Sequence, residues 1–413
     1  MDASSLVLRN ARVLDVRTGE YNQTDVVMNE GKIVSIGKGA ALPTKVEELD
    51  LSGKYLIPGL IDGHVHVTAP VADLGGTESM SPTYVGVVAA KAMNGMLSRG
   101  FTTVRDAGGA DFGLALAQEQ GLISGSRLRY CGTAISQTGG HGDFRAPGIN
   151  SRTHCCTSVG RVVDGVPAVR EAARDELRKG AHHIKIMASG GIASPTDRMD
   201  STQFSATEIA AVVEEAEAAN RYVAAHAYTA RAVNRCLELG VRSIEHGNLI
   251  DQSSVDLFLK HDAYLAMTLS THWAIGEEGR DYGMSQENWL KIGSIFEDGL
   301  EALRLADKAG VNLVYATDLL SGMQRYQGYE FKFRARVQSN LDVLRSATVT
   351  AAAMMQEVGH IGELVEGAVA DALILDSDPL EDIDVLASFA ERRGRVVQGG
   401  KLLDEVLYAI PRR

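Results

Sequence analysis

The stretch 59–66, GLIDGHVH, follows a short apolar run that ends at Pro58 and carries two histidines, His64 and His66. In an extended strand alternate side chains leave the same face, so both imidazoles can reach one metal ion without distortion. The same spacing also fits two surface histidines on an ordinary strand. The pair therefore predicts a metal site, and ligands elsewhere in the chain must decide between the two interpretations.

The composition indicates a globular protein that acts on small molecules. The chain has 413 residues, of which 45% are hydrophobic and 23% charged, and no apolar run reaches the length that crosses a bilayer. Its 41 Lys and Arg against 53 Asp and Glu give a net charge of -12, which disfavours nucleic acid as a partner. We expect neither a nucleic-acid partner nor a membrane span.

The cysteines and the N-terminus predict a cytoplasmic protein. Cys131, Cys155, Cys156 and Cys236 form no CxxC pair, and a disulfide between the adjacent Cys155 and Cys156 would be strained. The opening residues MDASSL do not resemble a secretory signal, although a signal removed before residue 1 would leave the same sequence. Reduced thiols are therefore expected.

Both ends of the chain show short strands separated by turn signals. The predicted strands include residues 6–8, 11–14, 26–28, 31–36, 372–375, 395–397 and 399–403. Because both ends show the same pattern of short strands, we expect them to form one small sheet together.

Between about Pro58 and Gly359, apolar strands alternate with helical stretches, which is typical of parallel β/α units. One unit has a helix over 168–179, a stop at Gly180 and a buried strand over 184–187. In the next unit, a helix capped by Ser205 or Thr207 precedes a strand at 222–226. Later helices at 231–239 and 300–309 precede strands at 243–246 and 313–318.

This repetition favours a (β/α)8 TIM barrel, whose chemistry gathers at the C-terminal ends of the strands. A doubly wound open sheet is the alternative. It predicts a Gly-rich phosphate loop after the first strand, and neither GxGxxG nor GxxxxGK[ST] occurs there.

Polar side chains stand at the ends of the predicted strands. In chain order they are His64, His66, Lys185, His226, His246 and Asp318. In a barrel these ends surround one mouth, so the side chains would converge on a single pocket. Singly, His226 fits a core histidine, Asp318 a helix N-cap and Lys185 a side chain that reaches solvent. Together they favour a site, because burying polar groups without a use is costly.

Five motifs carry a resemblance to a known family: PGLIDGHVH at 58–66, IKIMASGG at 184–191, HAY at 226–228, EHG at 245–247 and ATD at 316–318. On these residues the chain resembles the amidohydrolase superfamily, in particular its prolidase-like branch of Xaa-Pro dipeptidases and ochratoxin-cleaving amidases. The resemblance spans nearly the whole chain and is more specific for the superfamily than for the substrate. It implies a (β/α)8 barrel over 58–359, a small β-sandwich domain built from 1–57 and 360–413, and a homo-oligomer, with an octamer as one candidate.

The resemblance also implies a centre with two divalent metal ions. It implies that His64, His66 and Asp318 bind one ion and that His226 and His246 bind the second. It also implies that Lys185 bridges the two ions. An ammonium would repel two cations, whereas a neutral amine that captures carbon dioxide becomes an anionic carbamate able to span both. Burial lowers the lysine pKa and favours this capture. Imidazole and oxygen ligands suit zinc, and manganese or cobalt also fit these ligand types.

In the predicted mechanism, a hydroxide bridging the two ions attacks a polarised carbonyl. Asp318 orients it, accepts the water proton and delivers this proton to the leaving nitrogen. The Asp318→Asn variant is expected to keep the fold and lose orders of magnitude in rate.

Substrate contacts are less defined. The resemblance assigns His141 and Tyr228 to the scissile carbonyl or a terminal carboxylate, and the glycines around His141 allow a tight loop over the mouth. That loop also fits a mobile segment without a function. Arg198 or Arg325 could hold a carboxylate, although each fits a solvated loop charge. His272 and Trp273 fit either an aromatic wall or packing residues.

The predicted function is hydrolysis of the amide bond in small carboxylate-bearing substrates, namely dipeptides, N-acyl amino acids or ochratoxin A-type phenylalanine amides. A cyclic amide or imidazolone hydrolase is the nearest alternative, distinguished by ring opening rather than splitting of the substrate. A non-catalytic barrel scaffold is an alternative from another class. The scaffold predicts missing ligands, and all six are present in the sequence.

Overall fold

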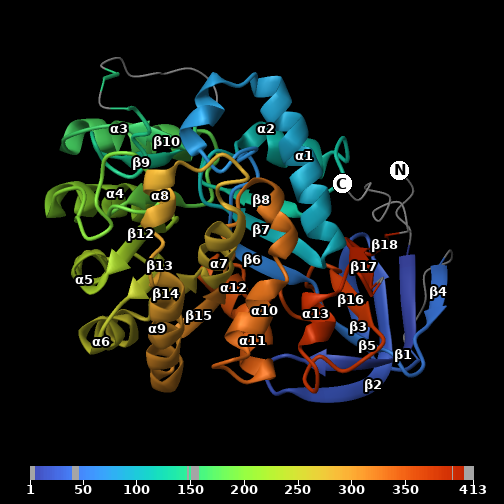
Figure 1. Ribbon diagram of the computed structural model, residues 1–413. Helices are drawn as coiled ribbons and strands as arrows, with labels where there is room; N and C mark the ends of the chain where they lie inside the picture. Colours follow the sequence, from blue (N-terminus) through green and yellow to red (C-terminus); the bar gives the residue numbers. More distant parts are fainter. Residues whose placement is uncertain (1–4, 40–45, 147, 150–157, 393, 404–413) are drawn as a thin grey trace.

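The computed structural model describes residues 5–39, 46–146, 148–149, 158–392 and 394–403, and in this part of the chain the strands form three sheets (Figure 1). Cys155 and Cys156 lie outside it, while Cys131 and Cys236 are buried free thiols. No helix among the described residues combines the length and the apolar character needed to cross a membrane.

The first sheet joins the two ends of the chain, in the order β18-β17-β16-β5-β1-β2-β3 with β4 paired to β1. Its strands are β1 (Ser5–Asp15), β2 (Glu20–Asn29), β3 (Lys32–Ile36), β4 (Val46–Asp50), β5 (Tyr55–Pro58), β16 (Ala372–Leu375), β17 (Arg395–Gln398) and β18 (Lys401–Leu402). Residues from both termini therefore share one sheet, as the strand pattern at the two ends predicted.

Two strands predicted near the N-terminus are a single strand. β1 runs through both, and its register with β2 shifts between Leu8 and Ala11. Asn10 has a φ of 57°, in the left-handed region. An extra residue of this kind bends a strand without ending its pairing. The turn signal in the sequence therefore marks a β-bulge, and the predicted break was wrong.

The middle of the chain forms two sheets of parallel strands, with orders β10-β9-β11-β12-β13-β14-β15 and β6-β7-β8. The strands are β6 (Leu60–Val65), β7 (Phe101–Asp106), β8 (Arg127–Tyr130), β9 (Ala134–Ser136), β10 (Gly160–Val162), β11 (Ile184–Met187), β12 (Val223–Thr229), β13 (Ser243–Leu249), β14 (Tyr264–Met267) and β15 (Asn312–Tyr315). Backbone hydrogen bonds link the two sheets at both sides. The N–H of Asp318 donates to His64 O at 2.8 Å, and the N–H of His182 donates to Tyr130 O at 2.8 Å.

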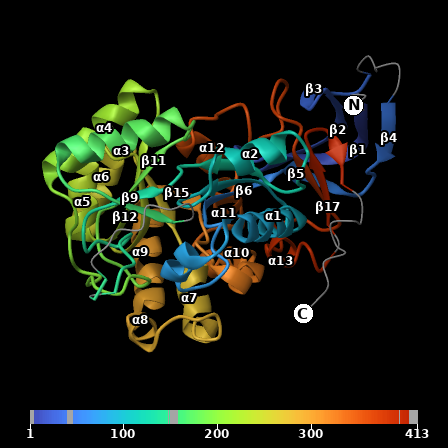
Figure 2. The same ribbon diagram turned by 90° about the horizontal axis from the view of Figure 1, so that it is seen from above.

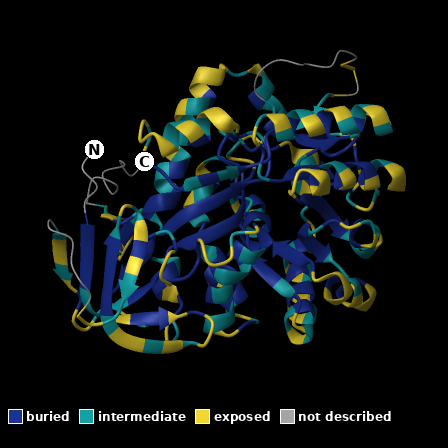
Figure 3. Ribbon diagram, turned by 180° about the vertical axis from the view of Figure 1, so that it is seen from behind, coloured by how far each residue is buried: buried dark blue, intermediate teal, exposed yellow. Residues whose placement is uncertain are grey.

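The helices are α1 (Pro82–Ser98), α2 (Phe112–Glu119), α3 (Val166–Arg178), α4 (Ala206–Ala218), α5 (Ala230–Glu238), α6 (Gln252–His261), α7 (Leu269–Glu278), α8 (Gln286–Leu290), α9 (Ile295–Ala309), α10 (Tyr329–Arg334), α11 (Asn340–Ser346), α12 (Val349–Met354) and α13 (Asp384–Ala387), with 3-10 helices at Leu74–Ser79 and Ser321–Tyr326. Helices up to α9 lie between the parallel strands in chain order, α10 to α12 follow the last of these strands, and α13 lies between β16 and β17. Figure 2 shows α3 to α6 at the end of the molecule opposite β1, β2 and β4. The outer faces of the helices carry many of the exposed residues, and most of the parallel strands are buried, whereas β4 and part of β2 are exposed (Figure 3).

The predicted β/α units match the structure closely, with small shifts at their ends. α9 begins at Ile295, before the predicted start. β15 ends at Tyr315, so Asp318 follows the strand rather than lying in it. Ser205 caps α4 with Glu208 in a reciprocal capping box, which rules out Thr207 as the cap.

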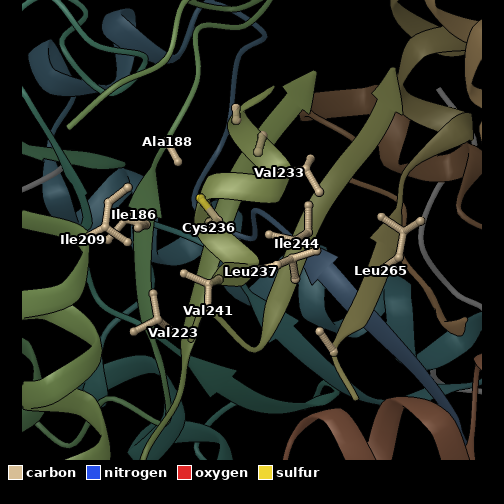
Figure 4. Close-up of a cluster of buried hydrophobic side chains, with 14 of the residues drawn as sticks. Ile186, Ala188, Ile209, Val223, Val233, Cys236, Leu237, Val241, Ile244 and Leu265 are labelled. Carbon is tan, nitrogen blue, oxygen red and sulfur yellow. The ribbon is translucent and has the colours of Figure 1, made fainter. Parts of the chain in front are cut away.

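Strand alternation separates a core face from a face with polar groups. Ile186 and Ile244 pack with Val233 of α5 in a buried cluster between the larger sheet and its helices (Figure 4). Because neighbouring side chains of a strand point to opposite faces, Lys185 and His226 lie on the other side. The apolar core on the helix side thus holds the polar side chains in position.

Candidate metal centre

The structure brings the predicted site residues together around one small cavity of about 50 Å³. Its lining includes His64, His66, His141, Lys185, His226, Tyr228, His246 and Asp318. These residues come from β6, β11, β12, β13 and the segments that follow β6, β9 and β15. Their side chains are buried, and the most open of them, Asp318, has an exposed fraction of 19%. Residues far apart in the sequence therefore line one cavity, while their roles as ligands stay a prediction.

Asp318 lies at the centre of this group. Its Oδ1 is 3.5 Å from His64 Nε2 and 3.3 Å from His66 Nε2, and its Oδ2 is 3.9 Å from His246 Nδ1. One ligand atom each from His64, His246 and Asp318 lie within 4.8 Å of one another, which is close enough to share an ion. The carboxylate thus faces histidines that the resemblance assigns to both ions.

Each of the four imidazoles has one ring nitrogen occupied by a protein partner. The pairs are His64 Nδ1 with Glu245 Oε2 at 2.7 Å, His66 Nδ1 with Gly108 O at 3.0 Å, His226 Nε2 with Gly190 O at 3.2 Å, and His246 Nδ1 with Thr268 Oγ1 at 2.8 Å. Such partners orient a ring and leave the opposite nitrogen for a metal ion. The donor set therefore fits a metal centre.

A buried ion pair supports His64 from behind. Glu245 and Arg105 are both fully buried, and Arg105 Nη2 lies 2.7 Å from each carboxylate oxygen of Glu245. Ser243 Oγ donates to Glu245 at 2.7 Å. Burial alone would raise the pKa of Glu245, but the charge of Arg105 holds this pKa well below its usual range. Glu245 is therefore an anion that accepts from His64.

Two of the predicted ligands have a backbone conformation that is unusual for their residue type. His246 has a φ of 75° and Asp318 a φ of 52°, in the left-handed region that favours glycine. At His246 this conformation departs from extended backbone, and two consecutive residues serve the site: Glu245 pairs with His64, and His246 lines the cavity. Strained residues of this kind cluster at functional sites.

Lys185 is buried, with an exposed fraction of 1%, and no described residue forms an ion pair with it. Burial is the main cause that lowers its pKa; the charge of Glu245 opposes this shift, and the charge of Arg105 adds to it. A lowered pKa favours the neutral amine, which is the form that can capture carbon dioxide. The environment of Lys185 therefore fits the bridging carbamate that the family resemblance implies.

The predicted substrate contacts lie on the same cavity, against predicted ligands. The ring of Tyr228 stacks on His246 at 5.0 Å, and its hydroxyl lies 2.9 Å from His272 Nε2. His141 stacks on His226 at 4.1 Å. His272 lines the cavity as well.

Three other candidates lie elsewhere. Arg198 pairs with Asp200 at 2.8 Å and has an exposed fraction of 82%, and Arg325 pairs with Glu278. Neither arginine lines the cavity, which agrees with the interpretation of each as a solvated loop charge. Trp273 packs against Tyr326 and other aromatic residues, which makes it a packing residue.

The sequence comparison identifies the class of protein. Residues 55–402 match the model of the amidohydrolase family, and the chain belongs to this family. It is a hydrolase that acts on C–N bonds. Members of the family typically use a metal centre, and the His and Asp cluster described above fits one.

Three relatives are similar to this chain over most of their length. Ochratoxinase from Aspergillus niger is 30% identical over 427 residues, which cover 97% of this chain and 87% of that protein. A prolidase crystallised with N-methylphosphonate-L-proline is 45% identical with a TM-score of 0.94, covering 97% of this chain and 99% of that one. A Xaa-Pro dipeptidase with methionine bound in its active site is 26% identical with a TM-score of 0.86, covering 97% and 100%. These likenesses imply a TIM barrel with an additional β domain.

Proposed function

We propose that this chain is a two-metal amidase for small substrates that carry a carboxylate next to the scissile amide. The observation that carries the proposal is the convergence of four imidazoles, Lys185 and Asp318 on one buried cavity. The substrate classes are Xaa-Pro and other dipeptides, N-acyl amino acids and ochratoxin A-type amides. The ligand in the similar prolidase supports the first class, and the likeness to ochratoxinase supports the last.

In this proposal the metal ions, with zinc as the expected element, supply a water that is acidic near neutral pH and polarise the substrate carbonyl. The residues that would hold them are His64, His66 and Asp318 for one ion, His226 and His246 for the other, and the carbamate of Lys185 between them. Glu245 keeps the ring of His64 turned so that Nε2 faces Asp318.

Asp318 is suited to move the proton. Burial would raise the pKa of Asp318, but the adjacent His64 and His66 hold it below its usual range. The carboxylate is therefore charged near neutral pH and can accept a proton from the attacking water. It then delivers this proton to the leaving nitrogen.

The proposed architecture is a closed (β/α)8 barrel over 58–359 with a β-sandwich domain from 1–57 and 360–413. The hydrogen bonds that link the segment after β15 with β6, and β8 with the segment before β11, support closure. The proposed assembly is a homo-oligomer that takes up a small-molecule amide.

The test combines metal analysis with a substrate panel. Protein loaded with zinc, manganese or cobalt is incubated with Xaa-Pro and other dipeptides, N-acyl amino acids, ochratoxin A and a cyclic imidazolone. We expect two ions per chain and products split at the amide, identified by mass spectrometry. Asp318→Asn should keep its metal and its thermal midpoint and lose orders of magnitude in kcat, while the exposed Asp200→Asn serves as the control.

Three results would contradict the proposal. They are fewer than two ions in fully active protein, a wild-type rate in Asp318→Asn, and turnover of the cyclic substrate alone. The last result would favour the imidazolone-type alternative.

A further inference from the structure

The imidazole of His141 is tightly packed beside the candidate metal centre. One face stacks on the ring of His226, with centroids 4.1 Å apart and an interplanar angle of 19°. The backbone of Gly191 lies against the ring, where a Cβ added at Gly191 would come within 2.3 Å of His141 Cε1. Only a residue without a side chain leaves this space for the ring. These two packing contacts restrict the position of the imidazole before any substrate binds.

A chain of hydrogen bonds leads from this ring to a buried carboxylate. His141 Nδ1 lies 2.7 Å from Ser194 Oγ, and the Ser194 hydroxyl donates to Asp197 Oδ1. Gln203 Nε2 donates to Asp197 Oδ2 at 2.8 Å, and Gln203 Oε1 accepts from the backbone N–H of His141 at 2.9 Å. All four side chains have exposed fractions of 9% or less. The network is therefore closed and shielded from water.

The order of donors along this series of hydrogen bonds determines which nitrogen of His141 carries a proton. A carboxylate only accepts, and a serine hydroxyl has one proton to donate. Ser194 gives that proton to Asp197, so its oxygen must accept from an N–H at His141 Nδ1. Nε2 is then the nitrogen left for a ligand in the cavity.

The loop that carries Ser194 and Asp197 is itself anchored. Lys291 Nζ donates to the backbone oxygen of Ser194 at 2.6 Å and to that of Asp197 at 3.3 Å. Asn288 of α8 donates to Ala193 O at 3.1 Å. The segment around α8 thus anchors the loop after β11, independently of the metal centre.

We propose that Ser194 and Asp197 are positioning residues that fix the ring orientation and tautomer of His141, so that Nε2 meets the substrate. The proposal rests on the proposed function in one respect, namely that His141 contacts the substrate. In Asp197→Asn the new amide can donate to Ser194 instead of accepting, so the tautomer of His141 is no longer determined. In Ser194→Ala the link is absent.

The test measures kinetics and a spectroscopic signature on metal-loaded enzyme. We expect kcat/KM to fall about 10- to 100-fold in Asp197→Asn and Ser194→Ala, mainly through kcat. Neither change should lower kcat/KM further when His141→Ala is already present, because both act through that ring. Ser194→Thr, which keeps the hydroxyl, should restore most of the rate. Asp200→Asn, in the same loop but exposed, is the matched control.

The nitrogen-15 spectrum of His141, assigned by its loss in His141→Ala, should show the proton on Nδ1 in the parent and a change in Asp197→Asn. A proton on Nε2 in the parent, parental kinetics in Asp197→Asn, or additive effects with His141→Ala would overturn the inference. Metal content and thermal midpoint identify a variant that has merely unfolded. In that case the nitrogen-15 spectrum of the parent still shows which nitrogen of His141 carries the proton and so tests the inference. If the parent cleaves no amide, the proposed function fails, and the tautomer alone decides this inference.

Discussion

Glu245 shows how much of the site depends on a single buried side chain. It accepts from His64 Nδ1 and from Ser243 Oγ and faces Arg105, all in the interior. The two charges compensate one another, and removing one partner leaves the other charge buried without compensation. Glu245 therefore contributes both to the stability of the fold and to the orientation of His64, a predicted ligand.

We predict that Glu245→Gln lowers the free energy of unfolding by about 3–5 kcal/mol, because the Arg105 charge stays buried. Metal affinity should fall about 10- to 100-fold, because His64 loses the partner that orients it. Urea unfolding and competition with a chelator measure the two effects. The exposed pair of Arg304 and Glu301 provides the control Glu301→Gln, which should change neither. A Glu245→Gln variant as stable as the parent would contradict this role.

His182 predicts a pH dependence of stability. Burial, helped by the charges of Arg129 and Arg221, lowers its pKa in the folded protein to about 4. The unfolded chain takes up this proton below pH ~6.5, whereas the folded chain does not until about pH 4. Stability is therefore lost as the pH falls between these values.

The expected loss from His182 is about 1–2 kcal/mol between pH 7 and pH 5. It is measured as the difference in unfolding free energy between the parent and His182→Phe at each pH. Taking the difference cancels contributions from other titrating groups, including the histidines of the metal centre. A difference that does not vary with pH would show that His182 is protonated equally in both states.

At the scale of elements, the ends of helices decide how the β/α units are held. The N-terminus of α4 is closed by Ser205 and Glu208, and Glu208 Oε1 also accepts from the N–H of Gly165 at the start of α3. One glutamate thus serves the first turns of two neighbouring helices. The cap stabilises the pair of helices that covers β11, the strand that carries Lys185.

Ser205→Ala is expected to lower the free energy of unfolding by about 1 kcal/mol, the usual cost of losing such a cap. Thr207→Ala is the matched control, because Thr207 lies within the helix and should have a much smaller effect. Chemical unfolding of both variants makes the comparison. Equal losses would contradict the assignment of Ser205 as the cap.

At the scale of the whole molecule, the site joins segments of both parallel sheets. The predicted ligands come from β6 and its following segment in one sheet and from β11, β12, β13 and the residues after β15 in the other. Ions bound by all of these would crosslink the middle of the chain, because binding to the folded state alone adds to its stability.

We predict that chelation removes activity and lowers the thermal midpoint of unfolding, and that adding zinc restores both. Calorimetry and elemental analysis on the same samples check this. His360→Gln, outside the cavity, should respond to chelation as the parent does. An unchanged midpoint and full activity in metal-free protein would contradict a two-metal centre.

The sequence by itself determined the β/α units, the shared sheet of the two ends and the group of polar residues at the strand ends. These features follow from local periodicity, from caps and stops, and from the position of polar residues after apolar strands. Such signals lie within a few residues of one another, so they survive without knowledge of the fold. The strand over 184–187 matches β11 for this reason.

Only the tertiary structure decided the partners that hold these residues. Arg105 and Glu245 are 140 positions apart, and His141 and Ser194 are 53 apart, so no local pattern joins them. With His246 in a left-handed conformation, two consecutive side chains reach the predicted site, Glu245 through its contact with His64 and His246 at the cavity, against the alternation that a strand predicts. Packing in the buried interior imposes such contacts, because a buried charge or ring nitrogen must find a partner wherever the fold supplies one.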